Sequence, residues 1–148
     1  MLPGQTKRFL KEFVCAASAF GASRVRLADT VGVLNPITTF DMVSSVRSAE
    51  KELPLEIHAH NDLGMATANT LAAYMAGANC LSTTVNGLGE RAGNAAMEEV
   101  AMALELSSGI SEYVAYRKIE RTKRICGQSF QPCTQRKQTH YRKHGAHA

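Results

Sequence analysis

The sequence predicts an α/β fold that forms part of a (β/α)₈ (TIM) barrel, and two observations predict it. First, the predicted strands have Asp29, His58 and Val85 near their ends, 29 and then 27 residues apart, with a helical segment in each interval. Parallel strands joined by crossover helices have about this spacing. Second, each strand has one apolar face and one polar face, which is typical of a barrel whose interior holds a polar site.

The first predicted element is a helix over residues 7–20, which Gly21 and Ala22 end. Its apolar side chains recur at helical spacing: Phe9, Leu10, Phe13, Val14, Ala17 and Phe20. A short strand over residues 24–29 follows. Pro36 then opens a helix over about 37–51 that stops before Pro54.

The second and third units repeat this order. We expect a strand over residues 55–60, a helix over about 66–76 and a third strand over residues 81–85. A glycine-rich loop over residues 86–94 leads to the last helix, over about 95–107. No sequence repeat accompanies the structural period.

Alternation within the strands predicts which face the helices cover. The apolar positions are Val25, Leu27, Leu55, Ile57, Leu81 and Val85. The polar positions are Arg24, Arg26, Thr30, Glu56, His58, His60, Ser82, Thr84 and Asn86. An open doubly wound sheet is usually apolar on both faces, so a barrel fits better, although a sheet with one wet face is the alternative. We also expect Arg26 and Glu56 to pair, because a lone charge inside would be costly.

Composition and charge place limits on the function. The chain has 148 residues, enough for one domain, and a hydrophobic content of 45% that is ordinary for a soluble protein. No apolar run is long enough for a bilayer span and no secretory signal is visible, so the sequence predicts no membrane partner. The four scattered cysteines favour reduced thiols in a cytoplasmic protein.

The net charge of +4 comes from one end of the chain. Residues 1–112 carry 8 Lys+Arg against 12 Asp+Glu, whereas residues 113–148 carry 9 against 1. The basic balance therefore says nothing about what the folded part binds, and we expect no specific nucleic-acid partner. We predict two regions: 1–112 as the barrel portion, and 113–148 as a basic tail that is partly helical at its start and then disordered.

Two histidines carry the sharpest chemical signal. His58 and His60 are two apart on a strand, so both imidazoles point to the same, polar face. Neutral imidazoles that converge at the end of a strand suit a divalent metal ion. The alternative is a pair of hydrogen-bonded core histidines.

The loop over residues 86–94 reads NGLGERAGN, which has GxGxxxG spacing instead of the GxGxxG of a dinucleotide site. Its glycines allow the backbone to approach a ligand closely. Glu90, Arg91 and Asn94 then stand at the mouth before a helix amino terminus, which favours anionic groups. An ordinary strand-to-helix turn is the alternative.

Asp29 and Thr30 end the first strand. The Thr30 hydroxyl would lie beside His60 at the mouth of the barrel. The alternative is that the Asp29-Thr30 dipeptide caps the loop.

Four sequence motifs, in the same order along the chain, resemble those of a known enzyme family. RLADTVGVLNP over 26–36, HAHNDLG over 58–64, ATANTLAA over 66–73 and TVNGLGERAGN over 84–94 resemble the last three strands of the isopropylmalate synthase/homocitrate synthase family. The resemblance covers residues 7 to about 112. The first and third motifs look most like the homocitrate synthases of nitrogen fixation.

The resemblance implies the last three βα units of a (β/α)₈ barrel in an acyltransferase that joins acetyl-CoA to a 2-oxo acid, 2-oxoglutarate in homocitrate synthases. It implies that His58, His60 and Asn94 are ligands of a divalent metal, with Mg, Mn and Zn not distinguished. It implies that Thr30 binds the carboxylate of the oxo acid, and places Glu90 and Arg91 on the substrate side. The same-family alternative is isopropylmalate or citramalate synthesis.

This sequence also departs from the family. It has no counterpart of the first-strand motif that supplies a polarising arginine and an acidic metal ligand, so no catalytic residue is assigned. Two imidazoles and one amide should hold a metal weakly. Three βα units leave two exposed parallel edges, so we expect a complementing barrel half or a homo-oligomer as partner. A non-catalytic remnant is the alternative from a different class.

Overall fold

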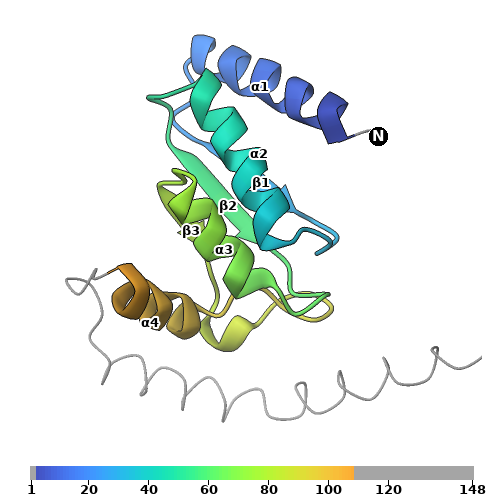
Figure 1. Cartoon of the computed structure of the whole chain (residues 1–148), viewed down its shortest axis with the longest axis vertical. Coiled ribbons are helices and arrows are strands. Elements are labelled where there is room, and N and C mark those ends of the chain that lie inside the picture. Colours follow the sequence, from blue (N-terminus) through green and yellow to red (C-terminus); the bar gives the residue numbers. More distant parts are fainter. Residues whose placement is uncertain (1–2, 109–148) are drawn as a thin grey trace, which may run out of the picture.

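The computed structural model describes residues 3–108, and these form one layer of parallel strands with helices packed on one side (Figure 1). The elements in chain order are α1 (Pro3–Ala19), β1 (Val25–Asp29), α2 (Pro36–Ala49), β2 (Leu55–Ala59), α3 (Ala66–Met75), β3 (Cys80–Ser82), the 3₁₀ turn η1 (Val85–Gly87) and α4 (Met97–Ser108). The alternation of strands and helices is confirmed. The predicted tail, 113–148, lies outside the described residues.

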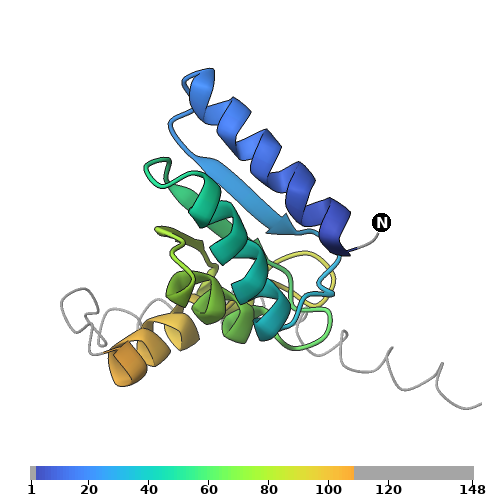
Figure 2. The same ribbon diagram turned by 45° about the horizontal axis from the view of Figure 1, so that its top comes forward.

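The sheet has the order β1-β2-β3 with both pairs parallel. Val25 pairs with Leu55, and His58 lies opposite Ser82. Sequential order with parallel pairing is the arrangement of consecutive barrel strands. Figure 2, turned from the first view, shows α1 lying along β1 at the edge of the sheet.

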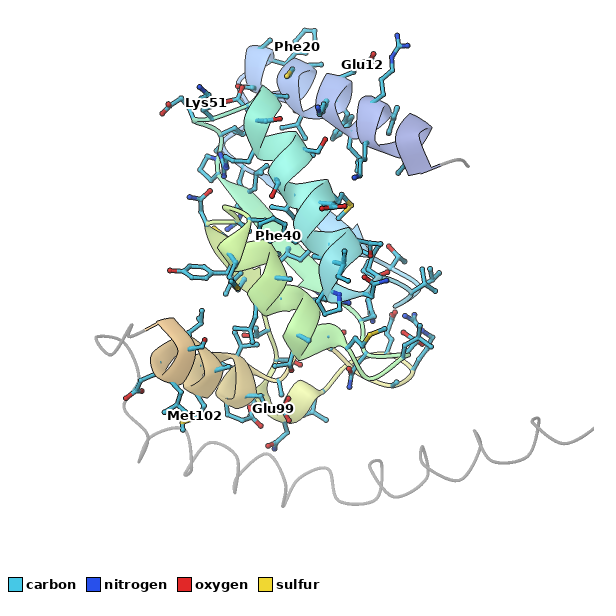
Figure 3. The ribbon with its side chains drawn as sticks, in the orientation of Figure 1. Glu12, Phe20, Phe40, Lys51, Glu99 and Met102 are labelled. Atoms are coloured by element: carbon cyan, nitrogen blue, oxygen red, sulfur yellow. The ribbon has the colours of Figure 1, made fainter. Side chains whose placement is uncertain are left out.

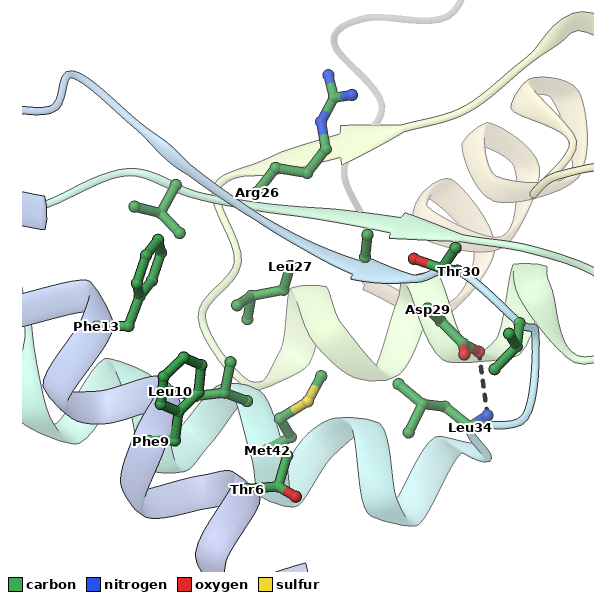
Figure 4. A pocket seen from close by; sticks show the side chains of 13 residues that line it. Thr6, Phe9, Leu10, Phe13, Arg26, Leu27, Asp29, Thr30, Leu34 and Met42 are labelled. Carbon is green, nitrogen blue, oxygen red and sulfur yellow. Dashed lines mark hydrogen bonds between the residues drawn. The ribbon is translucent and has the colours of Figure 1, made fainter. Parts of the chain in front are cut away.

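The two faces of the sheet divide as the alternation predicts. The apolar face packs under the helices, and its core includes Val25, Leu27, Leu55, Ile57, Val14, Val43 and Val46. On the other side of β1, Arg26 points away from Leu27 and Leu10 (Figure 4). The expected Arg26–Glu56 pair is confirmed, because Arg26 Nε lies 2.7 Å from Glu56 Oε1. Arg24 Nε lies 2.9 Å from the second oxygen of the same buried carboxylate, so two guanidinium groups compensate one charge.

The third strand is shorter than predicted. It ends at Ser82, and Val85 begins a 3₁₀ turn and does not continue the strand. The reason is the backbone of the following residues: Asn86 has φ +55° and Gly87 has φ +63°, which turn the chain out of the sheet. The Thr84 amide then donates to the Ala95 carbonyl of the returning loop, not to β2.

Helix ends follow local chemistry. Asn35 caps α2 in a reciprocal capping box with Thr38, and Pro36 occupies the first turn. The predicted helix at 37–51 is thus observed at Pro36–Ala49, because Glu50 is already extended. The first helix begins earlier than predicted, at Pro3, and the last begins later, at Met97.

Apolar side chains also remain on the outside of the helices. Phe20 at the end of α1 is 92% exposed, and Phe40 on α2 is 41% exposed (Figure 3). Among the described helices, none combines the length and apolar character that a membrane crossing requires.

Candidate metal and substrate site

His58 and His60 lie side by side at the carboxyl end of β2. Their ring centroids are 5.0 Å apart with the ring planes nearly perpendicular. His58 is half-buried, whereas His60 is only 7% exposed. The predicted convergence of the two imidazoles is therefore observed.

A hydrogen bond orients the His58 ring. Its Nδ1 lies 3.0 Å from Ser82 Oγ on the neighbouring strand, where Ser82 is the register partner of His58. This contact occupies Nδ1 and leaves Nε2 as the nitrogen for a ligand. Burial lowers the pKa of His58 below its usual value, and the neighbouring His60 and Arg26 lower it further, so the ring is neutral at neutral pH. A neutral imidazole is the form that binds metals.

Asn94 joins the histidines from the glycine-rich loop. His60 and Asn94 pair as an isolated antiparallel bridge, and the neighbouring Asn61 amide donates to the Gly93 carbonyl at 2.9 Å. A Cβ on Gly89 would lie 2.7 Å from the side-chain amide atoms of Asn94. Gly89 thus provides the space that the Asn94 side chain occupies.

Several buried polar atoms at this end of the sheet have no hydrogen-bond partner among the described residues. They include His60 Nδ1, Asn94 Oδ1 and Thr84 Oγ1. Such atoms are normally paired in proteins, because an unpaired buried donor or acceptor is costly. A hydrogen-bonded core histidine would describe His58, because its ring contacts the Ser82 hydroxyl. It does not describe His60, because His60 Nδ1 has no partner among the described residues.

The donor set fits a divalent cation. Two imidazoles and a side-chain amide are nitrogen and oxygen donors that such ions accept. Within residues 3–108, no cluster of three His, Cys, Asp or Glu side chains that could hold a metal ion is present, so a third donor from this region would be of another kind, such as the Asn94 amide. The set is therefore short of a carboxylate among the described residues, and the weak metal binding expected from the sequence stays a prediction.

Asp29 caps the loop that follows β1, which is one of the two roles that the sequence allowed for Asp29 and Thr30. Its carboxylate accepts from the Val33 and Leu34 amides at 3.1 and 3.0 Å, and Figure 4 shows the bond to Leu34. Thr30 is exposed at the strand end. Capping by Asp29 leaves the substrate role predicted for Thr30 open.

Arg91 is bound within the chain. Its Nε and Nη2 donate to the two carboxylate oxygens of Asp62 at 2.7 and 2.8 Å, and Nη2 also donates to the Thr30 carbonyl at 2.7 Å. Sequence reasoning missed Asp62, although it stands two residues after His60. Glu90 is mostly exposed, with its carboxylate 3.8 Å from Arg91 Nη1.

The helix after the loop already has anionic neighbours. Glu98 and Glu99 occupy the first turn of α4, and Glu98 Oε2 accepts from the Asn86 amide at 3.1 Å. These carboxylates interact with the positive end of the helix dipole, where the sequence predicted an anionic ligand.

Comparison with known proteins identifies the family. The model of the family described as HMGL-like matches residues 4–126. The chain belongs to the HMGL-like family. The matched segment runs past residue 112, so the boundary that we place between barrel and tail stays a prediction.

The similar proteins include 2-isopropylmalate synthases and homocitrate synthases. The chain is 48% identical to 2-isopropylmalate synthase 2 of Caldanaerobacter subterraneus, with 82% of this chain and 35% of that protein covered. It is 54% identical to homocitrate synthase 1 of Nostoc sp., with 70% of this chain and 27% of that protein covered. The chain thus spans about a third of the length of these relatives.

Solved structures agree on the fold. HMG-CoA lyase of Bacillus subtilis superposes with a TM-score of 0.74 at 24% identity, covering 84% of this chain and 44% of that one. Pyruvate carboxylase of Rhizobium etli superposes with a TM-score of 0.71 at 22% identity, covering 79% and 12%. The predicted α/β fold with barrel-type parallel strands is thereby confirmed.

Proposed function

We propose that this HMGL-like chain is the carboxyl-terminal part of a metal-dependent acyltransferase that condenses acetyl-CoA with a 2-oxo acid, 2-oxoglutarate in the leading hypothesis. The observation that carries the proposal is the meeting of His58, His60 and Asn94 at the carboxyl ends of the strands. There, His60 Nδ1 and Asn94 Oδ1 are buried without partners among the described residues. The carboxyl-terminal face is where barrel enzymes place their sites.

Each residue has a role in the proposed site. His58, His60 and Asn94 would hold a divalent cation, whose chemistry when bound is to polarise the keto group and to stabilise the alkoxide that forms. The hydroxyl of the exposed Thr30 would donate to the carboxylate of the oxo acid. Glu90, exposed beside Arg91, would lie on the substrate side. A general base for acetyl-CoA is not assigned to this chain.

The substrate is the finer part of the proposal. Relatives named homocitrate synthase and 2-isopropylmalate synthase match with similar identity, so the choice of 2-oxoglutarate rests on the resemblance of residues 26–36 and 66–73. An isopropylmalate or citramalate synthase is the second candidate. A link to nitrogen fixation and a cytoplasmic location belong to the same proposal.

The edge of the sheet supports a complementing barrel half as partner. In the described residues β1 pairs with β2 alone, so its other side is open. Beside it lies a groove of about 440 Å³ between α1 and β1, and Figure 4 shows Phe9, Phe13 and Leu27 lining it. A preceding parallel strand would pair with this edge and place apolar side chains in the groove.

The test measures thiol release from acetyl-CoA with a divalent metal and one of three oxo acids: 2-oxoglutarate and the oxo acids of isopropylmalate and citramalate synthesis. The full chain is assayed with and without the amino-terminal half of a homocitrate synthase barrel. Activity with 2-oxoglutarate on complementation, lost in His58→Ala, supports the proposal. Preference for another oxo acid favours the second candidate. The absence of thiol release in every mixture favours a non-catalytic remnant.

A further inference from the structure

Arg91 joins three loops that follow three different strands. Its guanidinium lies on the loop after β3, binds the Asp62 carboxylate after β2 through two nitrogens, and donates to the Thr30 carbonyl after β1. A bidentate arginine–carboxylate pair fixes orientation as well as distance, because the two parallel bonds align both planar groups. Three hydrogen bonds of one side chain therefore define the relative position of the three loops.

Close packing reinforces the junction. A Cβ on Gly32 would overlap Asp62 Oδ2, so the loop after β1 rests against the same carboxylate that Arg91 binds. Arg91 itself has φ +56°, a conformation that side chains with a Cβ rarely adopt. Such a backbone persists where surrounding contacts hold it. The Asp62 contact is one that holds it.

Each partner of the pair is close in sequence to a proposed metal ligand. Asp62 follows His60 by two residues, and Arg91 precedes Asn94 by three. The bond from the Asn61 amide to the Gly93 carbonyl runs between the same two loops. A shift of the Arg91–Asp62 pair would thus change the separation of His60 and Asn94.

The engagement of Arg91 also bears on its chemistry. A guanidinium has five N–H donors, and three hydrogen bonds to Asp62 and Thr30 already engage it. An arginine with its charge already paired by a carboxylate is a weaker partner for a substrate carboxylate than a free one. The geometry favours a structural role at the mouth over direct substrate binding.

We propose that Arg91 and Asp62 form a positioning pair, which sets the distance between His60 and Asn94 and holds the Thr30 loop against them. This inference rests on the proposed function for its consequence at the metal site. Arg91 is then a positioning residue, and its replacement should disturb the site without unfolding the chain, because partly exposed ion pairs contribute little to stability.

The test is a double-substitution cycle on the full chain without an affinity tag. Co²⁺ affinity and the Co²⁺ absorption spectrum are measured for Arg91→Lys, Asp62→Asn and the double variant. His58→Ala/His60→Ala gives the background, because the other three of the five histidines lie after residue 139. The matched control is Glu12→Gln, which removes the exposed pair between Arg8 and Glu12 on α1, away from the site.

We expect each single substitution to lower Co²⁺ affinity about tenfold, as loss of a residue that supports a metal ligand does. The double variant should be no worse than either single variant, and the melting temperature should fall by no more than the control does. Arg91→Lys keeps the charge but loses the planar fork, so it should not rescue affinity. Two outcomes would overturn the inference, provided that the wild type binds Co²⁺ above background. One is a double variant whose loss of affinity is the sum of the two single losses, and the other is unchanged Co²⁺ affinity in the variants.

A second readout separates this inference from the proposed function. Hydrogen exchange of the Asn61 amide reports the contact with Gly93 without any metal. Asp62→Asn should accelerate that exchange more than Glu12→Gln does. If wild type binds Co²⁺ no better than background but this exchange is accelerated, the metal site fails and the positioning pair stands. Unchanged exchange overturns the pair.

Discussion

The two ends of the sheet each have an arginine that joins separate segments, yet they differ in how completely their polar groups are satisfied. At the amino ends of the strands, Arg47 donates to the carbonyls of Gly77, Glu50, Lys51 and Leu53 and to the Asn79 side chain. At the carboxyl ends, Arg91 joins Asp62 and Thr30, while buried polar atoms nearby lack partners among the described residues.

The backbone shows the same contrast. Asn86 and Arg91, both in the loop after β3, are the non-glycine residues with positive φ among those described. At the amino ends, Gly77 takes the positive φ, and a Cβ there would lie 3.2 Å from Arg47 Cγ. Both non-glycine residues with positive φ, and three buried polar atoms without partners among the described residues, thus lie where barrel enzymes have their sites. The contacts of Arg47 lie at the opposite end. We therefore expect substitutions at the two ends to change different measured quantities.

The largest expected effect is at the carboxyl end. His58→Ala/His60→Ala should lower the Co²⁺ affinity of the chain by at least about 100-fold, because loss of supporting residues alone reaches that range. Stability should fall only modestly, by about 1 kcal/mol, because the His58 ring loses its bond to Ser82 whereas His60 Nδ1 has no partner to lose among the described residues. Isothermal titration and thermal unfolding measure the two quantities. A strong loss of stability with retained affinity would remove the distinction between the ends.

The next effect is at the amino end. Arg47→Ala should lower the free energy of unfolding by about 2 kcal/mol, because it leaves several part-buried carbonyls without a donor. Denaturant unfolding measures this loss. The Co²⁺ affinity should not change, and Lys51→Ala, nearby but exposed, is the matched control. A Co²⁺ affinity that falls with Arg47→Ala would show that the two ends are coupled.

The glycine that accommodates Asn94 gives a smaller effect. Gly89→Ala should lower Co²⁺ affinity about tenfold, because the new methyl group displaces the Asn94 amide, and crowding of this kind costs about 1–3 kcal/mol. Gly21→Ala is the control: it has φ +82° and open space around it, so it should lower stability and leave affinity unchanged. Equal affinity in both variants would mean that Asn94 is not a ligand.

The sequence predicted the two faces of the strands better than it predicted the contacts between loops. Alternation in β1 and β2 predicted the buried Val25, Leu27, Leu55 and Ile57, because the period of a strand assigns each side chain to a face. It also predicted the pair of Arg26 with Glu56. The extent of β3 was wrong, since the left-handed backbone at Asn86 has no signal in apolar periodicity.

Most contacts between loops could not be predicted from the sequence. The pairing of Arg91 with Asp62 joins residues 29 apart through a positive-φ backbone. Nothing in the spacing of charges distinguishes such a pair from two exposed side chains. Arg47 was missed for a similar reason, because its partners are mostly backbone carbonyls that no side-chain pattern reports. The meeting of His60 with Asn94, by contrast, was implied by the resemblance to the synthase family.

The smallest effect concerns the support of one ligand. Ser82→Ala removes the hydroxyl 3.0 Å from His58 Nδ1, so the ring loses the contact that selects its orientation. A neutral hydrogen bond contributes about 1 kcal/mol, which corresponds to about a fivefold loss of Co²⁺ affinity. Ser82→Thr keeps the hydroxyl and should retain most of the affinity, and Thr83→Ala, which removes a hydroxyl from the next residue along the chain, is the matched control. If Ser82→Ala binds Co²⁺ as tightly as wild type, His58 is oriented by the strand alone, and the carboxyl end needs fewer supporting contacts than its geometry indicates.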